Sequence, residues 1–185
     1  MAESGRLILA SASPRRSAIL EQLGIAFEVV VPDVEEIAEG DPRALVIENA
    51  RRKAAAVDGE LVLGADTTVA LDGAILGKPR DEAEARSFLT SLSGRRHEVW
   101  SAIALNEETK AVRTGVTFRD ITGLIDWYLA TGEWEGKAGA YAIQGRGAAL
   151  VERIEGDYSN VVGLPIPALL ELMPDLLQRI PRQTD

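Results

Sequence analysis

The chain opens with a short apolar run at 7–10, followed by a polar turn and an amphipathic segment. Ser13 before Pro14 is typical of a helix start, because serine caps the helix and proline has no N–H that needs a partner there. Apolar residues at helical spacing then predict a helix that ends at Gly24. A second apolar run at 27–31 follows. The first thirty residues therefore predict a strand, a helix and a strand.

The same alternation continues along the chain. Asp41 caps a helix that runs to about Val57, and Asp72-Gly73 forms the two-residue turn of a β-hairpin. Further predicted elements are a helix capped by Asp81, strands at 97–105 and 110–118, a helix from Thr122 to Gly132, a glycine-rich loop and strand within 134–157, and a helix at 164–173. This order favours one α/β domain spanning 1–185, in which 179–185 is a frayed tail.

The composition limits the class of protein. Of the 185 residues, 46% are hydrophobic, which is enough to build the core of one domain. No apolar run reaches the roughly 18 residues of a membrane span, and the N-terminus lacks the pattern of a signal peptide. The absence of cysteine excludes disulfides and thiol catalysis. These features predict a cytoplasmic protein with no membrane partner.

The charge of the chain limits its ligands. The formal net charge of −9 argues against binding to a nucleic acid polymer, because such binding depends on neutralising many phosphates. It leaves room for a small anionic ligand in a locally basic pocket. The single histidine, His97, argues against a histidine base or a site with several histidine ligands. Acid–base or metal chemistry would therefore depend on carboxylates and lysines.

Several cations stand in unusual places. Arg15 and Arg16 fall in the first turn of a predicted helix, where the backbone already carries partial positive charge. A bound anion would explain two cations there. Helical spacing places Lys53 on the apolar stripe of the helix at 42–57. Lys53 is therefore either a lysine that snorkels at the edge of the core or a functional cation.

Asp66 falls inside a strongly apolar strand of the hairpin. A buried carboxylate needs hydrogen-bond partners or a metal, so Asp66 is either a satisfied structural aspartate or a functional group. Regular pairing would place Lys78 opposite Thr67, on the face away from Asp66, unless a bulge at Gly77 redirects it.

Two adjacent glutamates, Glu35 and Glu36, complete a set of carboxylates and cations. Such a set suits a polyphosphate bound with a divalent metal. The common phosphate-binding signatures are absent, since the chain has no Walker A pattern and its glycine-rich loop lacks the setting of a dinucleotide fingerprint.

Four segments, in this order and at similar spacing, resemble the Maf family of nucleoside triphosphate pyrophosphatases from about Leu7 to Met173. They are LASASPRRSAILEQLGI; EE followed by ARRKA; GADTTVALDGAILGKPRD with LSGRRHEV; and KAGAYAIQGRGAALVERIEGDYSNVVGLP. The resemblance implies a single α/β domain with a mixed, twisted β-sheet and flanking helices that form two lobes around a central cleft. It also implies hydrolysis of a nucleoside triphosphate to the monophosphate and pyrophosphate with a divalent cation, Mg²⁺ or Mn²⁺. A homodimer is suggested by the family and by nothing independent in the sequence.

The family's motifs imply roles for particular residues. Asp66 is the expected proton acceptor, and it shares the expected metal with Glu36. The catalytic group also includes Lys53 and Lys78. The expected substrate-binding residues are Ser11, Ser13, Arg15, Arg16, Thr67 and Gln144. Arg15, Thr67 and Gln144 match the positions that the family ties to base choice. The segments PRR, GADT and AYAIQG are similar to the branch of the family that acts on dTTP and UTP rather than on 7-methyl-GTP.

Some points stay open. Asn49 stands where the family more often has leucine, and the short loop before Asp41 leaves the choice between Glu35 and Glu36 open. Two other functions also remain: a nucleotide-binding regulator of cell division or septum formation with little turnover, and a house-cleaning pyrophosphatase for modified or purine nucleotides. The acidic and basic set weighs against the regulator, because binding alone does not require a carboxylate inside a strand.

Overall fold

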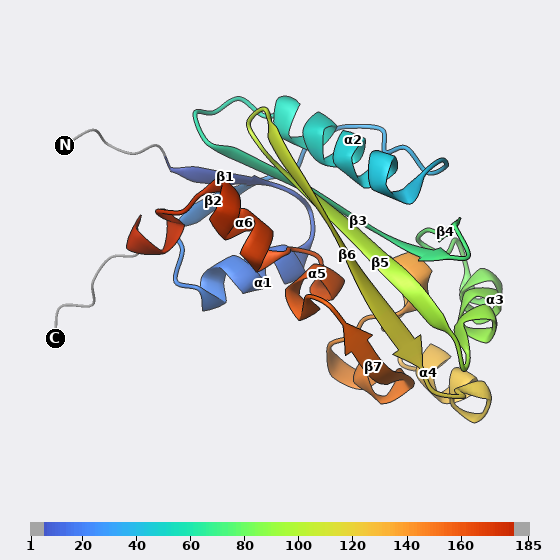
Figure 1. Ribbon diagram of the computed structural model, residues 1–185. Coiled ribbons are helices and arrows are strands. Elements are labelled where there is room, and N and C mark those ends of the chain that lie inside the picture. The colour runs from blue at the N-terminus through green and yellow to red at the C-terminus, as the bar shows by residue number, and fades with distance from the viewer. Residues whose placement is uncertain (1–5, 180–185) are drawn as a thin grey trace, which may run out of the picture.

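The computed structural model describes residues 6–179, which form a mixed, seven-stranded sheet with helices on both faces (Figure 1). The strands are β1 (Leu7–Ala10), β2 (Phe27–Val30), β3 (Val62–Leu71), β4 (Ala74–Leu76), β5 (Arg96–Leu105), β6 (Glu108–Phe118) and β7 (Val151–Glu155). The α-helices are α1 (Pro14–Gln22), α2 (Pro42–Ala55), α3 (Glu82–Leu92), α4 (Ile125–Leu129), α5 (Tyr158–Val162) and α6 (Ile166–Leu172). Short 3-10 helices are η1 (Thr122–Leu124), η2 (Ala138–Ala140), η3 (Gly145–Leu150) and η4 (Leu176–Arg179). Within the described part of the chain, no helix is long and apolar enough to span a membrane.

The predicted α/β order is confirmed, with differences in detail. Ser13 does occupy the cap of α1, but its side chain makes no capping hydrogen bond. Instead, the backbone N–H of Ser13 donates to Ser11 Oγ at 3.2 Å. The helix predicted from Thr122 is divided into η1 and α4. The predicted tail at 179–185 lies outside the described residues, except for the backbone of Arg179 at the end of η4.

The sheet has a break along one edge of β3. The strand order is β2-β1-β3-β5-β6-β7, with β1 parallel to both of its neighbours and the other pairs antiparallel. The edge of β3 away from β5 pairs with β1 at 62–64 and with β4 at 69–71. Among the described strands, none therefore lies beside residues 65–68 of β3 on that edge. The carboxyl ends of β1 and β2 lead to this break, and such ends are a common place for ligands in α/β folds.

Two apolar clusters cover the two faces of the sheet. One face packs against α2, through a cluster that includes Val46 and Ala50 of the helix and Val62 of β3. The larger cluster on the other face includes residues of α1, α3, α4 and α6, and it contains Leu63 and Ala65 of β3. Because side chains alternate along a strand, Asp66 points to the α2 face and Thr67 to the other face. Both residues nevertheless border the break in the sheet.

Candidate active site

A cleft of about 290 Å³ lies at the break beside β3. Its walls come from the turn after β1, the loop after β2, the middle of β3, Lys53 of α2, Lys78, and two later segments at 135–143 and 161–162. Five cationic side chains and three carboxylates line it. The cleft is therefore locally basic in a chain whose formal net charge is −9.

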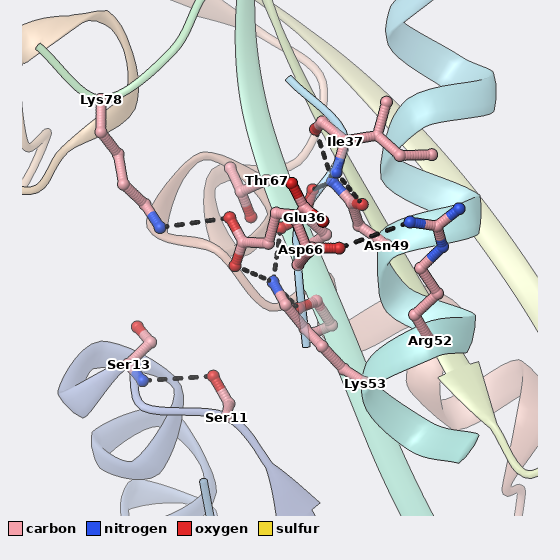
Figure 2. A network of polar contacts seen from close by, with 12 residues as sticks. Ser11, Ser13, Glu36, Ile37, Asn49, Arg52, Lys53, Asp66, Thr67 and Lys78 are labelled. Carbon is pink, nitrogen blue, oxygen red and sulfur yellow. Dashed lines mark hydrogen bonds and ion pairs between the residues drawn. The ribbon is translucent and has the colours of Figure 1, made fainter. Parts of the chain in front are cut away.

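Two carboxylates in the cleft share one lysine. Lys53 Nζ lies 2.7 Å from Asp66 Oδ1 and 2.7 Å from Glu36 Oε1. On its other side, Glu36 approaches Lys78, with Oε2 3.3 Å from Nζ (Figure 2). Lys53 is only 6% exposed, so it does not snorkel to solvent. Its ammonium is instead the centre of a buried polar cluster.

Close packing of α2 on β3 brings Lys53 to Asp66. Lys53 lies on the buried face of α2 with Val46 and Ala50, as the helical spacing predicts. At the facing point of β3, a Cβ added to Gly64 would lie 2.2 Å from the carbonyl oxygen of Ala50. Only glycine permits this approach of helix and strand. Gly64 therefore sets the short distance across which Lys53 reaches the carboxylate.

Asn49 joins the acidic loop to Asp66, a role that the sequence interpretation missed. Its side chain is 2% exposed. The amide Nδ2 donates to Asp66 Oδ2 at 3.0 Å and to the carbonyl oxygen of Ile37 at 3.0 Å, while Oδ1 accepts from the backbone N–H of Ile37 at 2.8 Å (Figure 2). The signal was present in the sequence, because Asn49 precedes Lys53 by one helical turn on the same face.

The geometry favours Glu36 over Glu35 as the second carboxylate. Glu36 contacts both lysines, whereas the contact of Glu35 is through its backbone carbonyl, which accepts from Arg52 at 3.4 Å. Partial burial opposes ionisation of Glu36, but the hydrogen bond and charge of Lys53, together with Lys78, outweigh it and lower the pKa of Glu36 below its usual value. Glu36 is therefore held as a carboxylate.

Lys78 reaches the site because β4 is short. The strand ends at Leu76, so the regular pairing that would place Lys78 opposite Thr67 does not form. No bulge is needed, since Gly77 leaves the ladder and its carbonyl accepts from the backbone N–H of Gly139 at 3.1 Å. The chain then turns toward Glu36.

The two arginines at the start of α1 differ in their surroundings. Arg16 is 7% exposed, and its guanidinium donates to Gly163 O at 2.8 Å, Ser11 Oγ at 2.9 Å and Thr67 Oγ1 at 3.1 Å. Arg15 is half-buried, and its Nε donates to the carbonyl oxygen of Val162 at 3.3 Å. Arg16 thus connects three walls of the cleft, while the Arg15 guanidinium makes no further hydrogen bond to a residue within 6–179.

Replacing Arg16 with methionine is expected to lower the free energy of unfolding by about 3 kcal/mol, because three acceptors lose a charged donor. Thermal or denaturant unfolding would measure the change. Arg6→Met is a matched control, since Arg6 is an exposed cation paired with Glu28. An Arg16→Met protein as stable as the control would contradict the structural role.

The residues expected to choose the base lie in different surroundings. Thr67 lines the cleft, and its hydroxyl is 2.8 Å from Ser101 Oγ. Gln144 is exposed, makes no side-chain hydrogen bond to any residue within 6–179, and is not among the residues that line the cleft. Its neighbour Ile143 does line it. Thr67 and Arg15 therefore line the same cleft. Gln144 does not line it, although it is next to Ile143, which does.

His97 does not line the cleft. It is 1% exposed, and its Nε2 is 2.8 Å from the hydroxyl of Tyr141, in a cluster that also includes Phe118. Burial lowers the pKa of His97 to about 4, so the imidazole is neutral at physiological pH. The prediction that chemistry in this protein depends on carboxylates and lysines agrees with this placement.

Metal binding here would depend on two carboxylates. Within the described residues, no group of three or more His, Cys, Asp or Glu side chains is arranged to hold a metal ion. Asp66 and Glu36 both lie 2.7 Å from the same ammonium, so their oxygens are close enough to share one cation. Mg²⁺ is commonly bound by one or two carboxylates together with phosphate oxygens of the substrate. The residues present therefore fit a divalent metal that binds together with a polyphosphate.

Comparison with known proteins assigns a family to this cleft and fold. The Maf-like protein family matches residues 6–176. A dTTP/UTP pyrophosphatase of Anaeromyxobacter dehalogenans is 49% identical over 91% of this chain and 92% of its own length. The dTTP/UTP pyrophosphatases of Myxococcus xanthus and Thermus thermophilus are 49% and 51% identical, over 93% and 90% of this chain and 93% and 92% of their own lengths. The chain therefore belongs to the Maf family.

Proposed function

We propose that this protein hydrolyses nucleoside triphosphates, foremost dTTP and UTP, to the nucleoside monophosphate and pyrophosphate. The observation that carries the proposal is the buried Asp66 carboxylate, which Lys53 joins to Glu36 inside a locally basic cleft. The similarity to relatives named dTTP/UTP pyrophosphatase supports the reaction and the bases.

Asp66 is suited to accept the proton of the attacking water. The oxygen of water forms a bond to the α-phosphorus, the bond from the α-phosphorus to the bridging oxygen breaks, and pyrophosphate leaves. Each carboxylate oxygen of Asp66 accepts one hydrogen bond, from Lys53 or from Asn49, which leaves further lone pairs on both oxygens. Asp66 can therefore take up the water proton while its partners hold it in place.

The divalent cation, Mg²⁺ or Mn²⁺, would be held by Asp66 and Glu36. When bound, such a cation polarises a phosphoryl oxygen and lowers the pKa of bound water. The lysines have a separate role: Lys53 fixes both carboxylates, and Lys78 places positive charge on the far side of Glu36. Positive charge so close to the carboxylates also offsets the charge that grows on the leaving pyrophosphate.

Pyrimidine triphosphates are expected to be hydrolysed at least about tenfold more efficiently than ATP or GTP, measured as kcat/KM. Gln144 carries an amide donor and an amide acceptor, which match the alternating carbonyls and N3–H of uracil and thymine. A purine base would leave these amide groups unpaired. Gln144→Ala should therefore reduce the difference in kcat/KM between pyrimidine and purine triphosphates, mainly by lowering kcat/KM for UTP and dTTP.

A pyrophosphate-release assay across nucleoside triphosphates, with and without Mg²⁺ or Mn²⁺, tests these expectations. Preference of the wild-type enzyme for purine or modified nucleotides would favour the house-cleaning function, and nucleotide binding without turnover would favour the regulator. Gln178→Ala is a control for the amide, because Gln178 lies in η4, outside the residues that line the cleft. A substrate ranking that Gln144→Ala leaves unchanged would remove Gln144 from base choice.

A further inference from the structure

The five cations that line the cleft are not equivalent. Lys53 and Lys78 are both in ion pairs with carboxylates. Arg16 has its three guanidinium nitrogens committed to oxygens of the protein. The remaining two are Arg15 and Lys137, and within residues 6–179 neither has a carboxylate at ion-pair distance.

Lys137 stands in the loop just before η2, and within residues 6–179 its side-chain ammonium has only one hydrogen-bond partner. Its Nζ donates to the backbone carbonyl oxygen of Glu135 at 2.9 Å, which leaves two of its three N–H donors available. The nearby carboxylate of Glu133 is engaged elsewhere, because it accepts from the backbone N–H groups of Arg146 and Gly147 at 3.1–3.2 Å. Lys137 is therefore a cation in the cleft whose charge no described residue pairs.

Arg15 and Lys137 both line the cleft, and the positive charge of Arg15 affects Lys137. Partial burial lowers the pKa of Lys137, and the positive charge of Arg15 lowers it further, while Glu133 and Glu135 act in the opposite direction. Burial also lowers the pKa of Arg15. An anion bound in the cleft would offset the repulsion between two partly buried cations. An ammonium and a guanidinium are both common phosphate ligands in proteins.

We propose that Lys137, together with Arg15, binds the triphosphate chain of the substrate, and that Lys137 is a substrate-binding residue of this enzyme. The motifs that pointed to the other site residues gave Lys137 no role, although it begins the segment KAGAYAIQG. The proposal rests on the proposed function for the identity of the ligand. It adds two cations to those of the site: Lys53 and Lys78 lie against the carboxylates, and Arg15 and Lys137 would contact the phosphates.

Tripolyphosphate is the suitable probe, because it carries the phosphate chain without a base or sugar and its binding requires no turnover. Calorimetry in metal-free buffer should show that Lys137→Met weakens tripolyphosphate binding about tenfold or more, since a charged hydrogen bond to the anion is lost. Lys137→Arg should retain affinity within about threefold, because it keeps the charge and the donors. Binding of the nucleoside uridine should not change in either variant.

Lys110→Met is the matched control, because Lys110 is paired with Glu171 on the surface and does not line the cleft. Three results would overturn the proposal: equal tripolyphosphate affinity in Lys137→Met and wild type, an equal loss in Lys137→Arg, or a parallel loss of uridine binding, which would indicate a damaged loop. Absence of nucleotide hydrolysis would instead contradict the proposed function, and the tripolyphosphate comparison would still decide the role of Lys137.

Discussion

Replacing Asp66 with asparagine is expected to lower kcat for dTTP by about 1000-fold or more, because the variant keeps the shape of the side chain but loses the charge and the basic oxygen. Metal should also no longer tighten nucleotide binding, since Asp66 and Glu36 are the two carboxylates proposed to hold the metal. Both lie 2.7 Å from Lys53 Nζ and are therefore close to each other. Steady-state pyrophosphate release measures the first effect, and nucleotide titration with and without Mg²⁺ measures the second.

Asp72→Asn provides the control for this substitution. Asp72 lies in the hairpin turn after β3, is exposed, and asparagine tolerates its positive φ of 52°. The control should keep wild-type kcat. Substantial metal-dependent turnover in Asp66→Asn would contradict the assignment and would move the role of proton acceptor to Glu36 or Glu35.

Lys53→Met is expected to have the second largest effect, a loss of about 100-fold or more in kcat with a decrease of about 3 kcal/mol in the free energy of unfolding. The substitution leaves Asp66, which is 6% exposed, without its cationic partner, and it frees Glu36 from the same contact. Pyrophosphate release measures the activity, and urea unfolding measures the stability.

The Lys53→Met/Asp66→Asn double variant separates a broken ion pair from lost packing. If Lys53 acts through Asp66, the double variant should be less destabilised than the sum of the two single variants, by about 0.5–3 kcal/mol. Arg51→Met removes a cation from the exposed side of the same helix and should change neither property. Additive losses in stability, or wild-type turnover in Lys53→Met, would show that Lys53 is only a packing residue.

The order of elements was predictable because it depends on local signals. Caps at Asp41 and Asp81 accept the backbone hydrogen bonds that such residues favour, and the Asp72-Gly73 turn forms the expected hairpin. The length of β4 was not predictable from local signals. The strand ends before Gly77, whose carbonyl oxygen accepts a hydrogen bond from the backbone N–H of the distant Gly139. This long-range contact is what places Lys78 beside Glu36.

Two residues of the site could be found in the sequence because each interrupts an apolar pattern. They are Lys53 on a buried helix face and Asp66 in a buried strand. Asn49 and Lys137 were assigned no role, because the importance of an asparagine inside a helix or of a lysine in a loop depends on partners far along the chain. The different environments of Arg15 and Arg16 arise in the same way, from contacts with Val162 and Gly163.

The most direct test of the proposed reaction is hydrolysis of dTTP in water labelled with heavy oxygen, with Mg²⁺, followed by mass spectrometry of the products. Attack at the α-phosphorus beside Asp66 predicts equal amounts of dTMP and pyrophosphate, with the label in dTMP alone. Label in pyrophosphate would mean attack at the β-phosphorus, and formation of dTDP with labelled orthophosphate would mean attack at the γ-phosphorus. Attack at the β-phosphorus would contradict the proposed attack at the α-phosphorus, and attack at the γ-phosphorus would contradict a pyrophosphatase reaction altogether.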